Sequence, residues 1–268
     1  MGEYINQLLS LDPADRSFLD SVIKVCDNIG ADAVVLQVGS RAAGFAGPDA
    51  DLDLWIVGDK DRLSDEQRSI HDRDGSVFVD RGDSDAHWTF FDREILTGLL
   101  SEWQDEKVWI VSTSKYLHGN RDTFEVLKDR YGKYPLGIAG TKLKWLVGHC
   151  GTLLGSMWGS DEEAQVTRLI ASGRLIEGLY KICCVADRIP IPYTKWLVKV
   201  GDATRLGGMI GPDLIQISVA GSPSTPIRQS LVEVRDAALE LLPSLGWDTD
   251  WIRDPFLAIS ESLKRPSP

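Results

Sequence analysis

Two aspartates separated by one residue, Asp51 and Asp53, could together hold a divalent cation. They begin the alternating segment 51–57, which has the pattern of a β-strand, so both carboxylates should point to the same face. Two adjacent negative charges repel each other, and placing them beside a core is costly unless a partner neutralises them. Carboxylates are preferred ligands of Mg²⁺ and Mn²⁺, which often share them with phosphate groups. The pair therefore predicts a Mg²⁺ or Mn²⁺ site, and the alternative is a solvated polar face of a strand.

A Gly-Ser pair, Gly39 and Ser40, follows the apolar segment 33–38, which has the pattern of a buried strand. Glycine lets the backbone approach a ligand closely. The amides of both residues, with the Ser40 hydroxyl, could donate hydrogen bonds to phosphate oxygens. A strand, a Gly-Ser loop and a carboxylate strand in this order arise by chance far less often than either short motif alone.

The elements that must position these residues follow from local patterns. A helix is expected after Asp12 and Pro13, because apolar residues then recur at helical spacing. Further strands are expected at 77–79 and 87–91, helices at 92–100, 142–157, 162–186, 193–206 and 228–242, and a loop at 211–227. The fold class expected is α+β, with a small N-terminal α/β domain that has a mixed sheet (1–133) and an all-helical C-terminal domain (134–268).

Composition narrows the class of partner. The 268 residues include 29 Lys and Arg against 40 Asp and Glu, for a net charge of −11. This balance argues against a nucleic-acid partner and favours a cationic small molecule. The sequence has no apolar run of the roughly 20 residues that cross a membrane. It has no signal-peptide pattern, and its four cysteines have no disulfide or zinc spacing, so a cytoplasmic protein is expected. The oligomeric state is not predicted.

Segment 38–57 resembles the nucleotidyltransferase superfamily typified by DNA polymerase beta and the antibiotic nucleotidyltransferases. The resemblance implies that Gly39 and Ser40 hold the triphosphate of ATP or another nucleoside triphosphate. It also implies that Asp51 and Asp53 bind the metal ions.

Two basic residues join the expected nucleotide site through a bacterial subgroup of the same superfamily. Arg41 fits the Gly-Ser-Arg-Ala-x-Gly variant of that subgroup. Lys195 lies in a segment similar to its Tyr-Pro-x-x-Lys-Trp-Leu-type motif. A cation near a helix start is not favoured by the helix dipole, so contact with the triphosphate is a candidate role for Lys195. The alternative is that Lys195 is a surface charge and that Tyr193 and Trp196 are packing anchors.

The superfamily also carries a third carboxylate on a neighbouring strand, and here the pattern departs from it. The matching segment, 85–91, places His87 or Thr89 where an acid is expected. Asp85, on the same face, is the best candidate for the third acid, and Asp80 is the fallback. His87 could instead be a general base, because imidazole titrates near neutral pH, or it could be an ordinary strand histidine.

The expected activity is metal-dependent transfer of a nucleoside monophosphate, such as AMP from ATP, to a hydroxyl of a small acceptor, with release of pyrophosphate. A cationic aminosugar suits the acidic chain, and the helical half is expected to form its pocket. Two alternatives stay open: nucleotide transfer to a protein or tRNA, and a degenerate, noncatalytic nucleotide-binding module.

Overall fold

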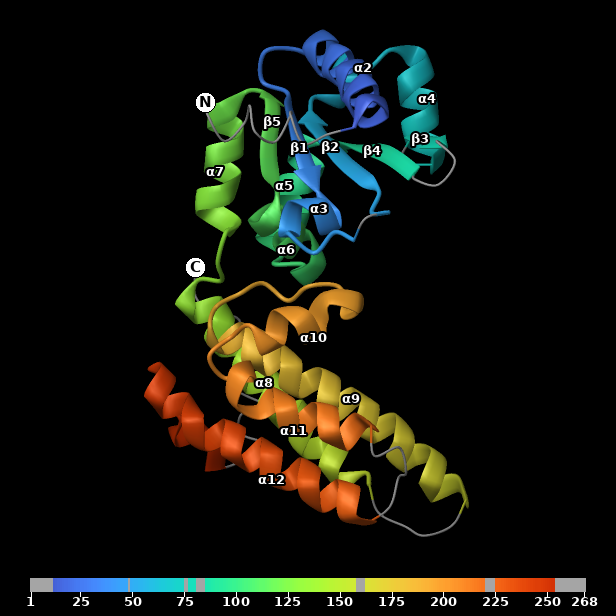
Figure 1. Cartoon of the computed structure of the whole chain (residues 1–268). Helices are drawn as coiled ribbons and strands as arrows, with labels where there is room; N and C mark the ends of the chain where they lie inside the picture. Colours follow the sequence, from blue (N-terminus) through green and yellow to red (C-terminus); the bar gives the residue numbers. More distant parts are fainter. Residues whose placement is uncertain are drawn as a thin grey trace. The chain divides into compact units, whose positions relative to one another are not determined.

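The fold has two parts. A computed structural model describes residues 12–47, 49–74, 77–80, 85–157, 162–219 and 225–253. Contacts divide the chain into two compact units, Met1–Gly132 and Lys133–Pro268. The first unit has a mixed sheet with helices, and the described part of the second is helical (Figure 1). The α+β class predicted from the sequence is confirmed.

The sheet of the first unit has five strands in the order β3-β4-β2-β1-β5. Their bounds are β1 (Val34–Val38), β2 (Leu52–Gly58), β3 (Val77–Asp80), β4 (Asp85–Asp92) and β5 (Lys115–Gly119). β1 is antiparallel to both β2 and β5, β2 is parallel to β4, and β3 is antiparallel to β4. The sequence predicted the first four strands and missed β5.

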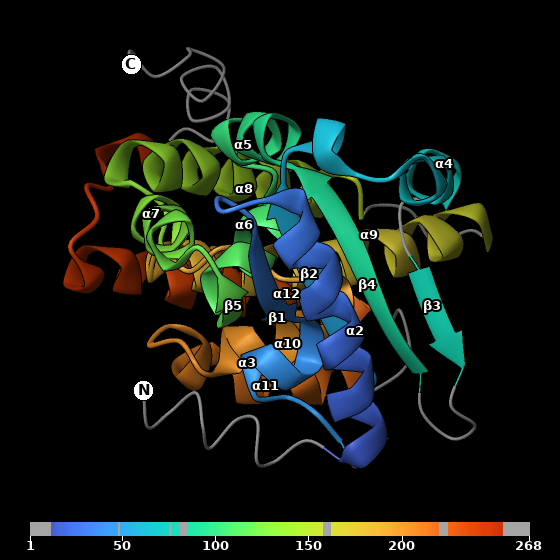
Figure 2. The ribbon, with the colours of Figure 1, turned by 90° about the horizontal axis from the view of Figure 1, so that it is seen from above.

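Helix α2 (Pro13–Ile29) begins where the sequence predicts. The Asp12 carboxylate accepts a 2.7 Å hydrogen bond from the backbone N–H of Asp15, and Pro13 fits the first turn. The helix packs over one face of the sheet (Figure 2). The core residues from α2 and β2 are Phe18, Leu19, Val22, Cys26, Ile29, Leu52, Leu54 and Ile56. Because strand residues alternate between faces, Asp53 lies on the face opposite α2.

The other helical elements of this unit are α3 (Gly39–Ala43), η1 (Lys60–Arg62), α4 (Asp65–Asp74), α5 (Arg93–Ser101), α6 (Asp105–Thr113) and α7 (Arg121–Tyr131). Short α3 takes the place of the Gly-Ser loop expected after β1. Helix α6, which the sequence did not predict, lies next to β1 and α3.

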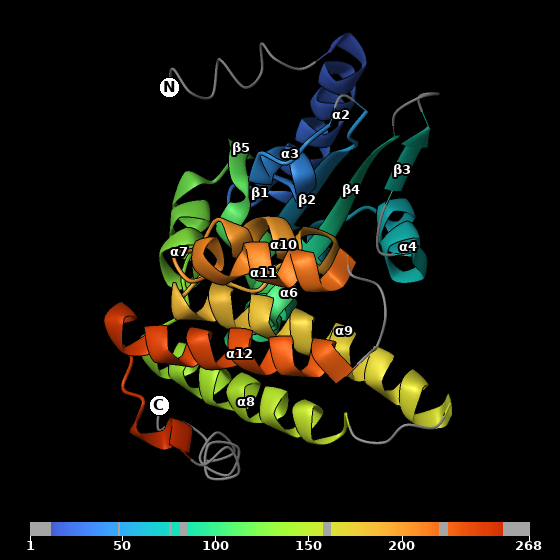
Figure 3. The same cartoon turned by 60° about the horizontal axis from the view of Figure 1, so that its bottom comes forward.

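The long helices of the second unit, α8, α9 and α12, lie side by side (Figure 3). The helical elements of this unit are α8 (Leu136–Gly155), α9 (Glu162–Ala186), α10 (Thr194–Asp202), α11 (Gly207–Val219), α12 (Thr225–Leu241), η2 (Leu242–Leu245) and η3 (Asp250–Arg253). Within the ranges described above, no helix is both long and apolar enough to span a bilayer.

The loop predicted at 211–227 is wrong where the structure describes it. Residues 211–219 belong to α11 and residues 225–227 to α12. Gly207 and Gly211, both in α11, permit close packing against α10. A Cβ atom on Gly207 would lie 1.9 Å from the Gly201 carbonyl oxygen, and one on Gly211 would lie 2.2 Å from Asp202 Oδ1. These close approaches explain why glycine stands at both positions.

Candidate metal and nucleotide site

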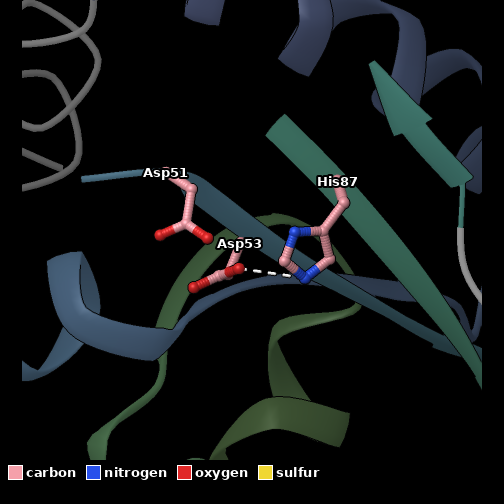
Figure 4. A group of neighbouring side chains, drawn as sticks. All are labelled: Asp51, Asp53 and His87. Atoms are coloured by element: carbon pink, nitrogen blue, oxygen red, sulfur yellow. Dashed lines mark ion pairs between the residues drawn. The ribbon is translucent and has the colours of Figure 1, made fainter. Parts of the chain in front are cut away.

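Three side chains that can bind a metal converge where β2 and β4 begin (Figure 4). Asp51 and Asp53 project to the same side of the β2 chain, and His87 projects from β4 toward Asp53. One ligand atom from each residue lies within 4.8 Å of the other two, and all three side chains are half-buried. Among the described residues, this is the one group of three or more metal-ligand side chains.

The strand register accounts for this convergence. In the parallel pair of β2 and β4, Asp53 is directly opposite His87, whereas Thr89 is opposite Trp55. His87 Nε2 lies 2.9 Å from Asp53 Oδ1. Of the two residues expected at the position of the third acid, His87 is therefore the one that faces the aspartates.

Gly39, the residue after β1, lies against Asp53 on the side of β2 away from β4. Val38, the last residue of β1, is opposite Asp53 in the antiparallel pair of β1 and β2. Gly39 follows with a φ of +69°, and a Cβ atom built on it would lie 1.9 Å from Asp53 Oδ2. Only glycine suits a position that combines a left-handed backbone with this approach to a carboxylate.

The other residue of the Gly-Ser pair is largely enclosed. Ser40 is 8% exposed, and its backbone carbonyl accepts a 2.8 Å hydrogen bond from the N–H of Phe45. The pair thus lies in a short helical turn between β1 and the segment that leads to Asp51. Contact of Gly39 and Ser40 with a triphosphate stays a prediction.

Arg41 positions the segment before the aspartates. Its guanidinium forms an ion pair with Asp15, which is 1% exposed, and its Nε donates a 2.8 Å hydrogen bond to the carbonyl oxygen of Ala50. Ala50 immediately precedes Asp51 in the chain. Arg41 therefore connects the start of α2 to the approach to β2, and its predicted contact with a nucleotide stays untested.

The remaining predicted residues are not brought to the triad by described contacts. Asp85 is the first residue of β4 and pairs with Asp80 of β3, but both side chains lie outside the described part of the structure. Lys195 is exposed in the first turn of α10, in the second unit, with Nζ 5.4 Å from the Trp196 ring centroid. Its contact with a nucleotide also stays a prediction.

One cation on the same face of the sheet was not found by sequence reasoning. Lys107, on α6, places Nζ 5.6 Å from the Trp55 ring and 5.3 Å from the Phe91 ring. The two rings contact each other, with centroids 4.3 Å apart. Trp55 lies two residues after Asp53 and therefore on its face of the strand. No motif marks this lysine, because only the fold brings α6 to these strands.

A cleft of about 690 Å³ lies at the other end of β2 and β4. Its polar lining already serves local structure: Asp92 caps α5 through the N–H of Glu94, and Arg93 donates to the Asp32 carbonyl. The cleft does not include the triad.

The triad has the donor chemistry of a divalent metal site. Two carboxylates carry like charge at short range, and the imidazole adds a nitrogen ligand. The missing side chain at Gly39 leaves Asp53 Oδ2 room on the side of β1. The residues present therefore fit such an ion.

The chain matches no protein-family model, and no curated protein is significantly similar to it in sequence. Among solved structures, it is similar to a nucleotidyltransferase-like protein from Exiguobacterium sibiricum 255-15. The two chains share 8% identity, with a TM-score of 0.43, over 87% of this chain and 72% of that one. A superposition this loose carries no functional argument, so the function proposed below rests on the site.

Proposed function

We propose that this protein is a divalent-metal-dependent nucleotidyltransferase that transfers AMP from ATP to a hydroxyl group of a small acceptor. The observation that carries the proposal is the close approach of Gly39 to Asp53. It puts the Gly-Ser turn against the carboxylate pair, as expected if one ligand is to touch both. The sequence resemblance assigns triphosphate binding to this turn and metal binding to this pair.

Asp51 and Asp53 would hold the divalent ion. When bound, the ion would neutralise phosphate charge and stabilise the oxygens that enter and leave in an in-line displacement. Gly39 and Ser40 would donate backbone hydrogen bonds to the triphosphate. Arg41 would act indirectly, by fixing the segment that ends at Asp51. These residues would contribute mainly orientation and charge complementarity, which are the main requirements of phosphoryl chemistry.

The proposed reaction is a single displacement. The acceptor oxygen forms a bond to the α-phosphorus, and the bond from that phosphorus to the oxygen bridging to the β-phosphate breaks. Pyrophosphate leaves with the electron pair of the broken bond. The hydroxyl proton passes to a base, for which Asp85 is a candidate on β4, or to solvent. The net charge of −11 favours a cationic acceptor such as an aminosugar.

A noncatalytic nucleotide-binding module is the second candidate. The observation that favours it is His87, which occupies the position opposite Asp53 where the superfamily carries an acid. This module would bind a nucleotide without releasing pyrophosphate.

The test measures two products: the label transferred to the acceptor from ATP labelled at the α-phosphate, and the pyrophosphate released. The assay contains Mg²⁺ or Mn²⁺ and a panel of aminated sugars and nucleosides. Asp53→Asn should lower the rate at least about 100-fold, the loss typical of removing one key electrostatic contact. Asp27→Asn is the matched control, since Asp27 also contacts a histidine, with His118 Nε2 at 2.7 Å. It should react like the wild type.

Three other outcomes separate the candidates. Label transferred to protein in a lysate would replace the small acceptor with a protein target. Nucleotide binding without release would favour the binding module. A reaction that survives Asp53→Asn would contradict the assigned site.

A further inference from the structure

We propose that His87 Nε2 is the third protein ligand of the ion held by Asp51 and Asp53, and that the site consequently prefers a first-row transition ion such as Mn²⁺ to Mg²⁺. This inference rests on the proposed function, because it concerns the ion which that function requires. It gives His87 a different role from the general base considered from the sequence.

The distances suit a shared ion. Ligands about 2.1 Å from one ion, at right angles to each other, lie about 3 Å apart. His87 Nε2 and Asp53 Oδ1 are 2.9 Å apart. One ligand atom from each of Asp51, Asp53 and His87 lies within 4.8 Å of the other two. Adjacent strands hold Asp53 and His87 at this separation, since the two residues are directly paired in register. The strands therefore preorganise two of the three ligands.

A second histidine–aspartate pair shows what distinguishes this site. His118 Nε2 lies 2.7 Å from Asp27 Oδ1, a contact much like that of His87 with Asp53. Within the described residues, however, that pair is not part of a group of three metal-ligand side chains. Asp27 is also far more exposed than Asp53, at 61% against 16%. The His118 pair has the character of a surface ion pair, whereas His87 faces two half-buried carboxylates.

The donor set determines the preferred ion. Mg²⁺ is a hard cation that favours oxygen ligands and an octahedral arrangement with several waters. Imidazole nitrogen is a softer ligand, and it binds first-row transition ions better than it binds Mg²⁺. Two carboxylates and a neutral imidazole carry a charge of −2, which balances one divalent ion. Three carboxylates would carry −3, so one divalent ion would leave a negative charge at the site unbalanced.

The test uses the full-length protein and Mn²⁺ as the probe, with and without a non-hydrolysable ATP analogue. Pulsed electron paramagnetic resonance detects the ¹⁴N coupling of an imidazole bound to Mn²⁺. Competition titrations give the ratio of the Mn²⁺ and Mg²⁺ dissociation constants. The wild type should show nitrogen coupling, and the control His118→Gln should retain it.

Two substitutions at position 87 keep the result interpretable. His87→Asp should bind Mn²⁺ without nitrogen coupling, and its preference for Mn²⁺ over Mg²⁺ should fall at least about tenfold. His87→Gln, which removes the nitrogen ligand without adding charge, should weaken Mn²⁺ binding about 10- to 100-fold. The urea midpoint of each variant shows whether it is folded under the assay conditions.

Two results would overturn the proposal. If Mn²⁺ binding depends on Asp53 but shows no nitrogen coupling with or without the nucleotide analogue, His87 is not a ligand. The proposed transferase function would survive that result. If neither Mn²⁺ nor nucleotide binds, the metal-ligand role and the proposed function both fail.

Discussion

Replacing Gly39 with alanine should damage the site through a single atom. The new Cβ would lie 1.9 Å from Asp53 Oδ2 and 2.8 Å from Asp53 Cγ. Real Cβ contacts essentially never fall below 3.0 Å, so the oxygen would have to move at least 1.1 Å, the difference between 3.0 and 1.9 Å. Rotation of the Asp53 side chain would not relieve the strain fully, because its own Cβ would still lie 3.1 Å away. The carboxylate must therefore leave the position from which it faces His87.

The expected energetic cost has two parts. An alanine at a φ of +69° costs about 1–2 kcal/mol relative to glycine. Displacing a side chain in a packed region adds about 1–3 kcal/mol. Gly39→Ala should therefore lower the free energy of unfolding by about 2–5 kcal/mol. Because metal sites tolerate little displacement of a ligand, Mn²⁺ affinity should fall about 10- to 100-fold.

Gly44→Ala is a matched control for the backbone part. Gly44 has a φ of +76°, but a Cβ atom built on it would meet nothing within 4 Å. This variant should lose only about 1–2 kcal/mol and should bind Mn²⁺ like the wild type. Urea unfolding and Mn²⁺ titration measure both effects. Equal destabilisation by the two substitutions, with unchanged Mn²⁺ affinity in Gly39→Ala, would refute the reasoning. The reasoning would also be refuted if Gly39→Ala destabilised the Asp53→Ala protein as much as it destabilises the wild type.

Two further predictions concern stability. Arg41→Met leaves buried Asp15 without its guanidinium partner and should lower the free energy of unfolding in urea by about 2–4 kcal/mol. The exposed pair of Arg121 and Glu125 should contribute less than about 1 kcal/mol. Equal losses on breaking the two pairs would contradict a stabilising role of Arg41. Burial raises the pKa of the Cys26 and Cys150 thiols to about 12 from an ordinary 9.0. The unfolded chain therefore loses these protons first, and stability should fall between pH 9 and 12 by up to about 1.4 kcal/mol per pH unit for each thiol. In Cys26→Ala and Cys150→Ala, the free energy of unfolding in urea should fall less steeply with pH than in the wild type. An equally steep fall would show that these thiols do not cause it.

Elements with strong local signals could be predicted from the sequence. The Asp12–Pro13 start and the helical recurrence of apolar residues identified α2. The apolar run before Gly39 and the alternation after Asp51 identified β1 and β2. Each of these signals lies within a few residues of the element it marks, so it does not depend on tertiary contacts.

Elements that depend on distant contacts were missed. In β5 only the side chain of Leu117 is buried, so the segment has no apolar run that would mark a strand. It is a strand because it pairs with β1. Helix α11 contains Pro212 and several glycines, which favour a loop on propensity alone. Close packing with α10 requires glycine at positions 207 and 211, which local reasoning does not reveal.

The candidate site divides in the same way. Strand alternation predicted that Asp51 and Asp53 share a face, which the structure confirms. The contact of His87 with Asp53 depends on a parallel pairing between β2 and β4 with α4 and β3 in between, so the sequence left His87 and Thr89 as alternatives. The partner of Arg41 is Asp15, 26 residues away, and no local pattern connects them.

The measurement that tests the central claim most directly is thermal unfolding with ATP, GTP, CTP or UTP, each with and without Mn²⁺. Wild type, Asp53→Asn and the control Asp27→Asn are compared. Nucleotide at 100 times its dissociation constant adds about 2.7 kcal/mol, or roughly 5–10 °C in Tm. The account predicts a Mn²⁺-dependent rise for one nucleotide in the wild type and in Asp27→Asn, and its loss in Asp53→Asn. No rise with any nucleotide at millimolar concentration, or an equal rise in Asp53→Asn, would contradict it.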